Sequence, residues 1–95
     1  MIKSFRNEAT RRLYFAQNAR AFPGLDLVKA INRMTYLDDA KSLAGIPNLG
    51  SFSLHALKGR RRAQWAISIN LRWRICFEFR DGNAYNVEIV DYHRG

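Results

Sequence analysis

From residue 65 to residue 90, apolar and polar side chains alternate, and this alternation constrains the fold more than any other feature of the chain. Successive side chains of a strand point to opposite faces of a sheet, so a period of two predicts strands with one buried face. Asp81-Gly82, followed by Asn83, interrupts the alternation and is a strong signal for a hairpin turn. We therefore predict an antiparallel meander whose buried face carries Trp65, Ile67, Ile69, Trp73, Ile75, Phe77, Phe79, Tyr85, Val87 and Ile89.

The first half of the chain has the period of helices instead. Met1 to Phe5 is expected to form a short first strand, and Asn7 can cap a helix that runs to about Ala19. A second helix is expected from about Leu25 to Ser42, with Pro23 suited to its start. The buried stripe of this second helix is predicted to consist of Leu27, Ile31, Met34 and Leu37.

Two further expectations complete the architecture. Lys29 and Arg33 recur at helical spacing on a face of the second helix other than the apolar one. Ser53 to Leu57 is expected to add a strand that leads into a basic loop. The whole chain, residues 1–95, is thus predicted to be one α+β domain. An N-terminal strand and two helices would pack on one face of an antiparallel sheet of about four to five strands, and the other face would stay open.

The charge balance of the chain is strongly positive. Its 95 residues include 16 Lys and Arg against 8 Asp and Glu, which gives a formal net charge of +8. A hydrophobic content of 47 % is too high for a disordered basic tail, so we expect the charge on a folded surface that attracts polyanions such as nucleic acid. The N-terminus lacks an apolar segment like that of a signal peptide, and no run is long enough to span a membrane. A cytoplasmic protein is expected.

The cysteine and histidine content argues against disulfides and metals. Cys76 is the lone cysteine, which excludes an internal disulfide, and it is interpreted as a small residue of the core or sheet. His55 and His93 are the two histidines, and neither they nor Cys76 have the spacing of metal ligands. We predict no metal site and no cofactor.

Two groups of arginines are candidates for phosphate contacts. The loop Lys58-Gly59-Arg60-Arg61-Arg62 is either a phosphate-binding patch or a solvated turn. Arg72 and Arg74 bracket Trp73, and they would face the open side of the sheet if Trp73 faces the helices. There they could pair with a carboxylate, Glu78 or Glu88, or bind phosphate. Core packing is the favoured interpretation of Trp65 and Trp73, with base stacking as the alternative.

The last strand ends in Asp91-Tyr92-His93, three side chains that can carry protons or bond to phosphate. With this cluster, five blocks of sequence resemble the HigB-type toxins of the RelE/ParE toxin–antitoxin superfamily. They are Leu54-His55-Ala56-Leu57-Lys58-Gly59, Gln64-Trp65-Ala66-Ile67, Asn70-Leu71-Arg72-Trp73-Arg74-Ile75-Cys76-Phe77, Asp81-Gly82 and Val87-Glu88-Ile89-Val90-Asp91-Tyr92-His93.

The resemblance implies a RelE-like fold and a ribosome-dependent, metal-independent endoribonuclease that cleaves mRNA and inhibits translation. The implied partner is a HigA-like helix-turn-helix antitoxin, and operator DNA would be bound only through the toxin–antitoxin complex. The implied catalytic residues are His55, Lys58, Arg74, Asp91, Tyr92 and His93. The residues expected to contact RNA are Arg60, Arg61, Arg62, Asn70 and Arg72. The chain departs from the family pattern at Arg60, Ala63, Ala66 and Arg72, and two of these changes make the site region more basic.

Metal-free RNA cleavage needs a base for the 2′-OH, charge stabilisation at phosphorus and an acid for the leaving 5′-oxygen. His93 or Asp91 is expected to serve as base or acid, with His55 in the complementary role. Lys58 and Arg74 would stabilise charge, and Tyr92 would position the phosphate or nucleotide. Two alternatives remain at this point: a gyrase poison of the ParE type, and a non-catalytic nucleic-acid-binding or inactive toxin homologue.

Overall fold

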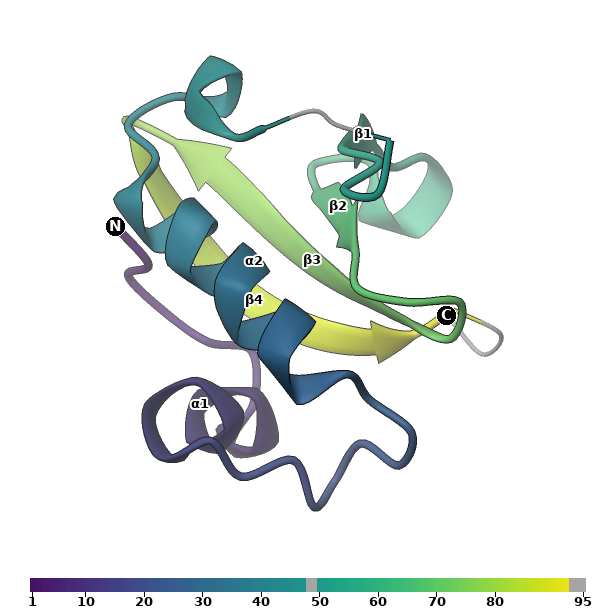
Figure 1. Ribbon diagram of the computed structural model, residues 1–95. Helices are drawn as coiled ribbons and strands as arrows, with labels where there is room; N and C mark the ends of the chain where they lie inside the picture. Colours follow the sequence, from purple (N-terminus) through teal and green to yellow (C-terminus); the bar gives the residue numbers. More distant parts are fainter. Residues whose placement is uncertain (48–49, 93–95) are drawn as a thin grey trace.

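The computed structural model describes residues 1–47 and 50–92. Two α-helices precede a four-stranded antiparallel sheet with the strand order β1-β2-β3-β4 (Figure 1). The elements are α1 (Glu8–Ala16), α2 (Leu27–Asp39), the 3₁₀ turn η1 (Leu43–Gly45), β1 (His55–Ala56), the 3₁₀ turn η2 (Gly59–Arg61), β2 (Trp65–Ser68), β3 (Trp73–Arg80) and β4 (Asn83–Asp91). The predicted α+β architecture is confirmed.

The hairpin of β3 and β4 is the longest paired unit of the sheet. Its turn places Asp81 (φ 53°) and Gly82 (φ 76°) in the left-handed region, as the Asp-Gly signal predicted. Partway along, Asn86 adopts φ 52°, and two residues of β4 lie opposite Phe77. This is a β-bulge, and the side-chain amide of Asn86 donates to Glu78 at 2.9 Å.

The predicted N-terminal strand is wrong in detail. Residues 1–6 run along the edge of β4, but they form only isolated parallel bridges at Ile2 and Phe5 (Figure 1). Between these bridges the N–H of Asn86 donates to the hydroxyl of Ser4 at 2.8 Å instead of to a backbone carbonyl. The bulge therefore interrupts the ladder that a regular strand would need.

Both helices are shorter than predicted. The side chain of Asn7 caps α1 as expected, but the helix ends at Ala16, before the predicted end at Ala19, because the C-cap Gln17 has a left-handed φ of 54°. At the start of α2 the cap is Asp26, whose carboxylate accepts the N–H of Lys29 at 3.0 Å. Pro23 is not the first helical residue; its carbonyl accepts the indole N–H of Trp73 at 2.9 Å.

The predicted strand 53–57 shortens to the two residues of β1. Ser53 breaks it from one side because its φ of 46° is left-handed. The chain pairs again at Leu57, whose N–H donates to the carbonyl of Gln64 at 3.0 Å, and then enters η2. His55 thus lies on a short edge strand between two turns.

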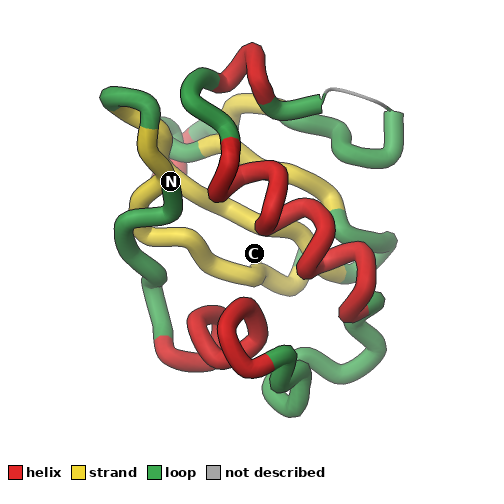
Figure 2. The backbone as a smooth tube through the Cα atoms, turned by 60° about the vertical axis from the view of Figure 1, so that its left-hand side comes forward, coloured by secondary structure: helices red, strands yellow, loops and turns green. Residues whose placement is uncertain are grey.

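The helices lie on one face of the sheet (Figure 2), and the buried side chains of both layers form the core between them. Trp73 is buried as predicted, whereas Trp65 is only partly buried at the margin of the core. Arg33, expected on another face of α2, is buried instead, and its Nε donates to the carbonyl of Ser68 at 3.0 Å. Neither α-helix of the described part of the chain is long and apolar enough to cross a bilayer.

Candidate active site

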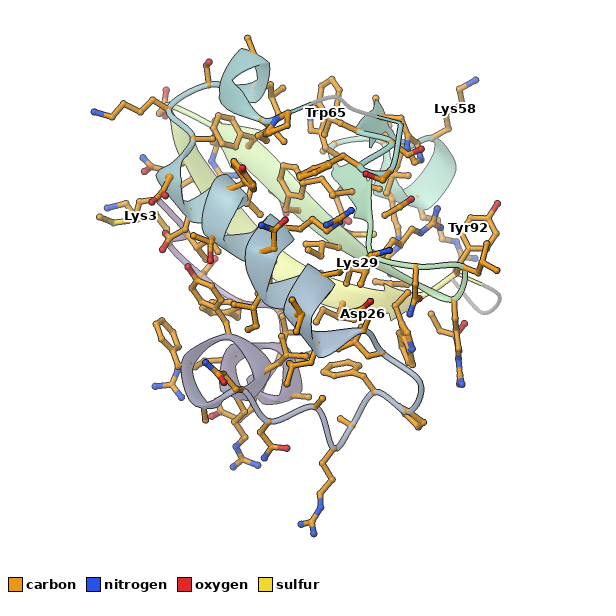
Figure 3. The ribbon with its side chains drawn as sticks, in the orientation of Figure 1. Lys3, Asp26, Lys29, Lys58, Trp65 and Tyr92 are labelled. Atoms are coloured by element: carbon orange, nitrogen blue, oxygen red, sulfur yellow. The ribbon has the colours of Figure 1, made fainter. Side chains whose placement is uncertain are left out.

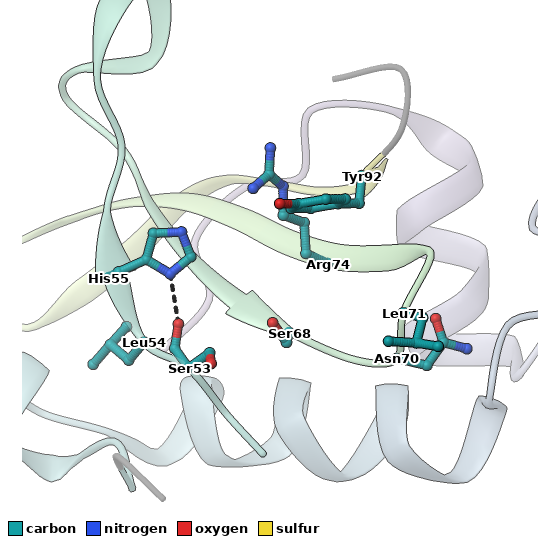
Figure 4. A pocket seen from close by; sticks show the side chains of 8 residues that line it. All are labelled: Ser53, Leu54, His55, Ser68, Asn70, Leu71, Arg74 and Tyr92. Atoms are coloured by element: carbon teal, nitrogen blue, oxygen red, sulfur yellow. Dashed lines mark hydrogen bonds between the residues drawn. The ribbon is translucent and has the colours of Figure 1, made fainter. Parts of the chain in front are cut away.

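An open hollow of about 580 Å³ lies where β1, β2, the start of β3 and the end of β4 come together. Figure 4 shows its lining side chains, which are Ser53, Leu54, His55, Ser68, Asn70, Leu71, Arg74 and Tyr92. Four of these were predicted as site residues: His55, Asn70, Arg74 and Tyr92. The predicted residues outside the hollow are Lys58, Arg60, Arg61, Arg62, Arg72 and Asp91, and His93 lies outside the described residues.

Arg74 supplies the positive charge of one wall. It projects from β3, and its Cζ lies 4.8 Å from the centroid of the Tyr92 ring. Its Nε is buried and has no hydrogen-bond partner among the described residues, where Arg74 also forms no ion pair. Buried polar groups are rarely left without a partner. Because Arg74 lines the hollow and has no carboxylate partner among the described residues, its positive charge can act on an anion bound there.

His55 lies across the hollow from Arg74 (Figure 4). Its Nδ1 is 2.6 Å from the carbonyl oxygen of Ser53. Because a carbonyl can only accept, Nδ1 must carry the proton of this bond. In the neutral ring, Nε2 then has a free lone pair and can accept a proton from a ligand.

Of the two alternatives left open for the strand arginines, pairing with Glu78 or Glu88 is not the one that the described residues show. Arg72 pairs with Asp91 at 3.0 Å and lies over the ring of Trp73. The two glutamates have other partners, because Glu88 pairs with Arg61 and Glu78 with Arg80. Register explains this outcome, since Trp73 is directly opposite Asp91 on β4 and Arg72 precedes that position.

The basic loop is divided between structure and solvent. Its centre is the turn η2, where Gly59 adopts φ 67°. Arg61 is half-buried and binds both Glu88, at 3.3 Å, and Gln64, at 3.0 Å. Lys58 extends away from the body of the protein (Figure 3), and Arg60 and Arg62 are also exposed. The side chains of these three residues are exposed to solvent at the turn, and their contact with RNA stays a prediction.

Four lining residues were missed from the sequence: Ser53, Leu54, Ser68 and Leu71. The side chain of Asn70 has a structural role, since its oxygen accepts the N–H groups of Arg72 and Trp73 at 3.1 and 2.9 Å. An Asn that begins a turn between two strands is a known signal for such bonds. It could have located this loop, though not the hollow.

Among the described residues, no group of His, Cys, Asp and Glu side chains is arranged to hold a metal ion. Cys76 is buried on the other face of β3 from the helices, packed with Ala66, Val90 and Leu57. Burial raises the pKa of its thiol. This cysteine therefore acts as a packing residue, as predicted.

The sequence and the fold both match known toxins. Residues 3–93 match the family model described as the RelE-like toxin of the type II toxin–antitoxin system HigB. The chain is 33 % identical to Endoribonuclease HigB of Proteus vulgaris over 93 residues, which cover 98 % of this chain and 100 % of that protein.

Two solved structures share the fold. A histidine-to-glutamine mutant of YafQ from E. coli superposes with a TM-score of 0.67 at 14 % identity, covering 99 % of this chain and 97 % of that one. The copper-bound form of a leucine-to-serine mutant toxin from Helicobacter pylori gives a TM-score of 0.66 at 16 % identity, covering 99 % and 98 %.

These matches define the chain as a RelE-like toxin of a type II toxin–antitoxin system. Within that class it belongs to the HigB-like toxin family.

Proposed function

We propose that this toxin is a ribosome-dependent endoribonuclease that cleaves mRNA and thereby inhibits translation. The observation that carries the proposal is the hollow, where the Nε2 of a histidine faces an arginine that forms no ion pair with any carboxylate of residues 1–47 and 50–92. None of the eight lining residues is acidic, so the hollow suits a phosphodiester. The name of the P. vulgaris relative supports the same activity.

His55 fits the role of general base. Nε2 would take the proton of the ribose 2′-OH while the 2′-oxygen attacks the adjacent phosphorus. The bond from Nδ1 to Ser53 fixes the tautomer and stabilises the imidazolium that forms. The P–O5′ bond then breaks, which yields a 2′,3′-cyclic phosphate and a 5′-hydroxyl.

Arg74 fits the role of stabilising the charge that develops on the phosphoryl oxygens. Its guanidinium is held against the Tyr92 ring, so it is preorganised and little ordering is needed at the moment of reaction. Lys58 would supply a second cation from the neighbouring loop when RNA is bound.

The proton for the leaving 5′-oxygen would come from the end of β4. Asp91 and Tyr92 are positioned there, with His93 next in the chain. The ion pair with Arg72 holds the Asp91 side chain at this end of the sheet. Tyr92 would also position the phosphate or nucleotide through its exposed ring.

The remaining cations would bind the ribosome. Arg60 and Arg62 are exposed at the turn between β1 and β2, and each phosphate contact would add about 0.7 to 0.9 to the slope of log affinity against log salt. The toxin would act in the cytoplasm without a metal or cofactor. A HigA-like helix-turn-helix antitoxin would neutralise it, and the complex would bind operator DNA.

Primer extension on a defined mRNA, with and without 70S ribosomes, tests this function. Wild-type toxin should cut only when ribosomes are present, and His55→Ala should slow cleavage about 10²- to 10⁴-fold. His93→Ala should cause a loss of the same order if His93 is the acid. Lys41→Ala changes an exposed lysine remote from the hollow and should cut like wild type.

The absence of cuts in every lane would overturn the proposal. A supercoiling assay with DNA gyrase would then examine the ParE-type alternative. Cleavage that His55→Ala leaves unchanged would instead remove His55 from the mechanism while leaving the nuclease activity in place.

A further inference from the structure

A second hollow adjoins the first. It has a volume of about 390 Å³ and lies between α2 and the loops before β1 and β3. Four residues line both hollows: Ser53, Ser68, Asn70 and Leu71. The others lining the second are Lys29, Gly50, Ser51 and Ile69. The two hollows therefore share a wall formed by these four residues and are continuous with each other.

The second hollow is also free of acidic side chains and has cations on two sides. Lys29 is exposed and lines it directly. Arg33 lies behind Ser68 and is only 5 % exposed, with its Nε bound to the carbonyl of that residue and its guanidinium 4.4 Å from the centroid of the Phe52 ring.

No ion pair neutralises Arg33 among the described residues. A buried cation without a counter-charge is costly, and its field is poorly screened by solvent. An anion in the adjoining hollow would lower this cost. The charge arrangement thus favours a ligand with a phosphate.

Leu71 adds an apolar contact between the two hollows. It is 95 % exposed, yet its loop is held in place because Asn70 accepts two backbone N–H groups and donates to the carbonyl of Gly24 at 3.1 Å. Figure 4 shows Leu71 beside Asn70, away from His55 and with Ser68 between them. A rigidly presented apolar side chain next to cations matches the two parts of a nucleotide, base and phosphate.

We propose that the second hollow binds a third nucleotide, which adjoins the two nucleotides whose shared phosphodiester is cleaved in the first hollow. In this subsite Lys29 contacts the phosphate and Leu71 packs on the base. The positive charge of the buried Arg33 attracts the same phosphate without touching it. The inference rests on the proposed endoribonuclease function, because it extends the path of the same RNA strand from His55 past Leu71 to α2.

Short 2′-O-methyl RNAs, which cannot be cleaved, provide the test. Binding of two-nucleotide and four-nucleotide oligomers is measured by fluorescence anisotropy for wild type, Lys29→Ala, Leu71→Ser and the control Lys41→Ala. Leu71→Ser should lower the affinity for the longer oligomer about fivefold, which is the loss expected when one modest apolar contact is removed. Lys29→Ala should lower its salt slope by about 0.7. The shorter oligomer and the control should show neither change.

Each other outcome counts against the subsite. Equal losses for both lengths, no loss for either, or no binding of the longer oligomer by wild type would overturn it. The same variants are run in the primer-extension assay with ribosomes. If wild type cleaves there but the oligomer results are negative, the subsite fails and the nuclease function stands. If wild type does not cleave, the nuclease function fails, and length-dependent losses would then show a nucleotide site without catalysis.

Discussion

The two walls of the hollow are built on very different supports. Arg74 and Tyr92 come from the hairpin of β3 and β4, whose ladder runs from the Trp73–Asp91 pair to the Arg80–Asn83 pair. His55 comes from β1, which has two residues and is joined to the sheet only by its pairing with β2. The hairpin wall, formed by Arg74 and Tyr92, therefore shares the stability of the core. The histidine wall, formed by His55, is held only by the short pairing of β1 with β2.

This difference indicates where the site can adjust. A segment with few buried contacts opens at a much lower free energy than the global unfolding of the domain. By this criterion the segment that carries His55 opens locally more readily than the hairpin that carries Arg74 and Tyr92.

The largest loss of stability is expected when a core side chain of the β3–β4 hairpin is removed. Phe77→Ala empties a fully buried site in β3 and should lower the free energy of unfolding by about 3–5 kcal/mol. Leu54→Ala, at a half-buried site beside β1, should cost less than about 2 kcal/mol. Urea denaturation measures both, and equal losses would contradict the division between the walls.

The next effect concerns the fixed charge of the hairpin wall. Arg74→Lys keeps the charge but loses the planar fork that lies over Tyr92, so cleavage in programmed ribosomes should slow about 10²- to 10³-fold. The melting temperature should change little, because Arg74 forms no ion pair among the described residues. Activity near the wild-type level would show that a point charge is sufficient there.

A smaller effect is expected at β1. Ala56→Gly loosens the strand that carries His55 and should cost about 0.5–1 kcal/mol. Leu57 packs over the cluster that contains Cys76, so local opening of this edge should expose the thiol. Labelling of Cys76 by a thiol reagent should then accelerate about two- to fivefold, in proportion to that free energy.

Ala16→Gly, at the exposed last residue of α1, is the control, because it makes the same substitution without contact with the cluster. It should leave the rate of Cys76 labelling unchanged. Equal acceleration in both variants would mean that the thiol is exposed by global unfolding, and β1 would then not open separately.

The smallest effect depends on pH and lies in the hairpin. The hydrogen bond from Asn86, with a further contribution from Arg80, lowers the pKa of Glu78 below its usual range. The ionised form therefore stabilises the fold: its contribution is fully present above the ordinary pKa, about 4.3, and is lost as the pH falls through the lowered value. Glu78→Gln should be slightly less stable than wild type at neutral pH and equal to it in acid. A difference independent of pH would contradict this assignment.

Much of the fold could be predicted because local signals agreed with tertiary structure. Period two located β2, β3 and β4, Asp81-Gly82 located their turn, and Asn7 located the start of α1. The errors fall where a distant residue decides the backbone. The bulge at Asn86 depends on Ser4, and the burial of Arg33 depends on a carbonyl 35 residues away.

The same distinction applies to the candidate site. The kinds of side chain could be read from the sequence, since His55, Arg74 and Tyr92 were predicted and line one hollow. Their partners could not, because strand register decides that Arg72 pairs with Asp91 and Arg61 with Glu88. Leu71 gave no signal, since exposure is a property of the folded loop.

The two edges of the sheet differ in how they limit pairing with another molecule. On one side, residues 1–6 cover part of β4 and use N–H and C=O groups that another chain could otherwise bind. On the other side, β1 is too short to template a neighbouring strand. Both edges thus offer little unpaired backbone for edge-to-edge pairing with the sheet of another molecule.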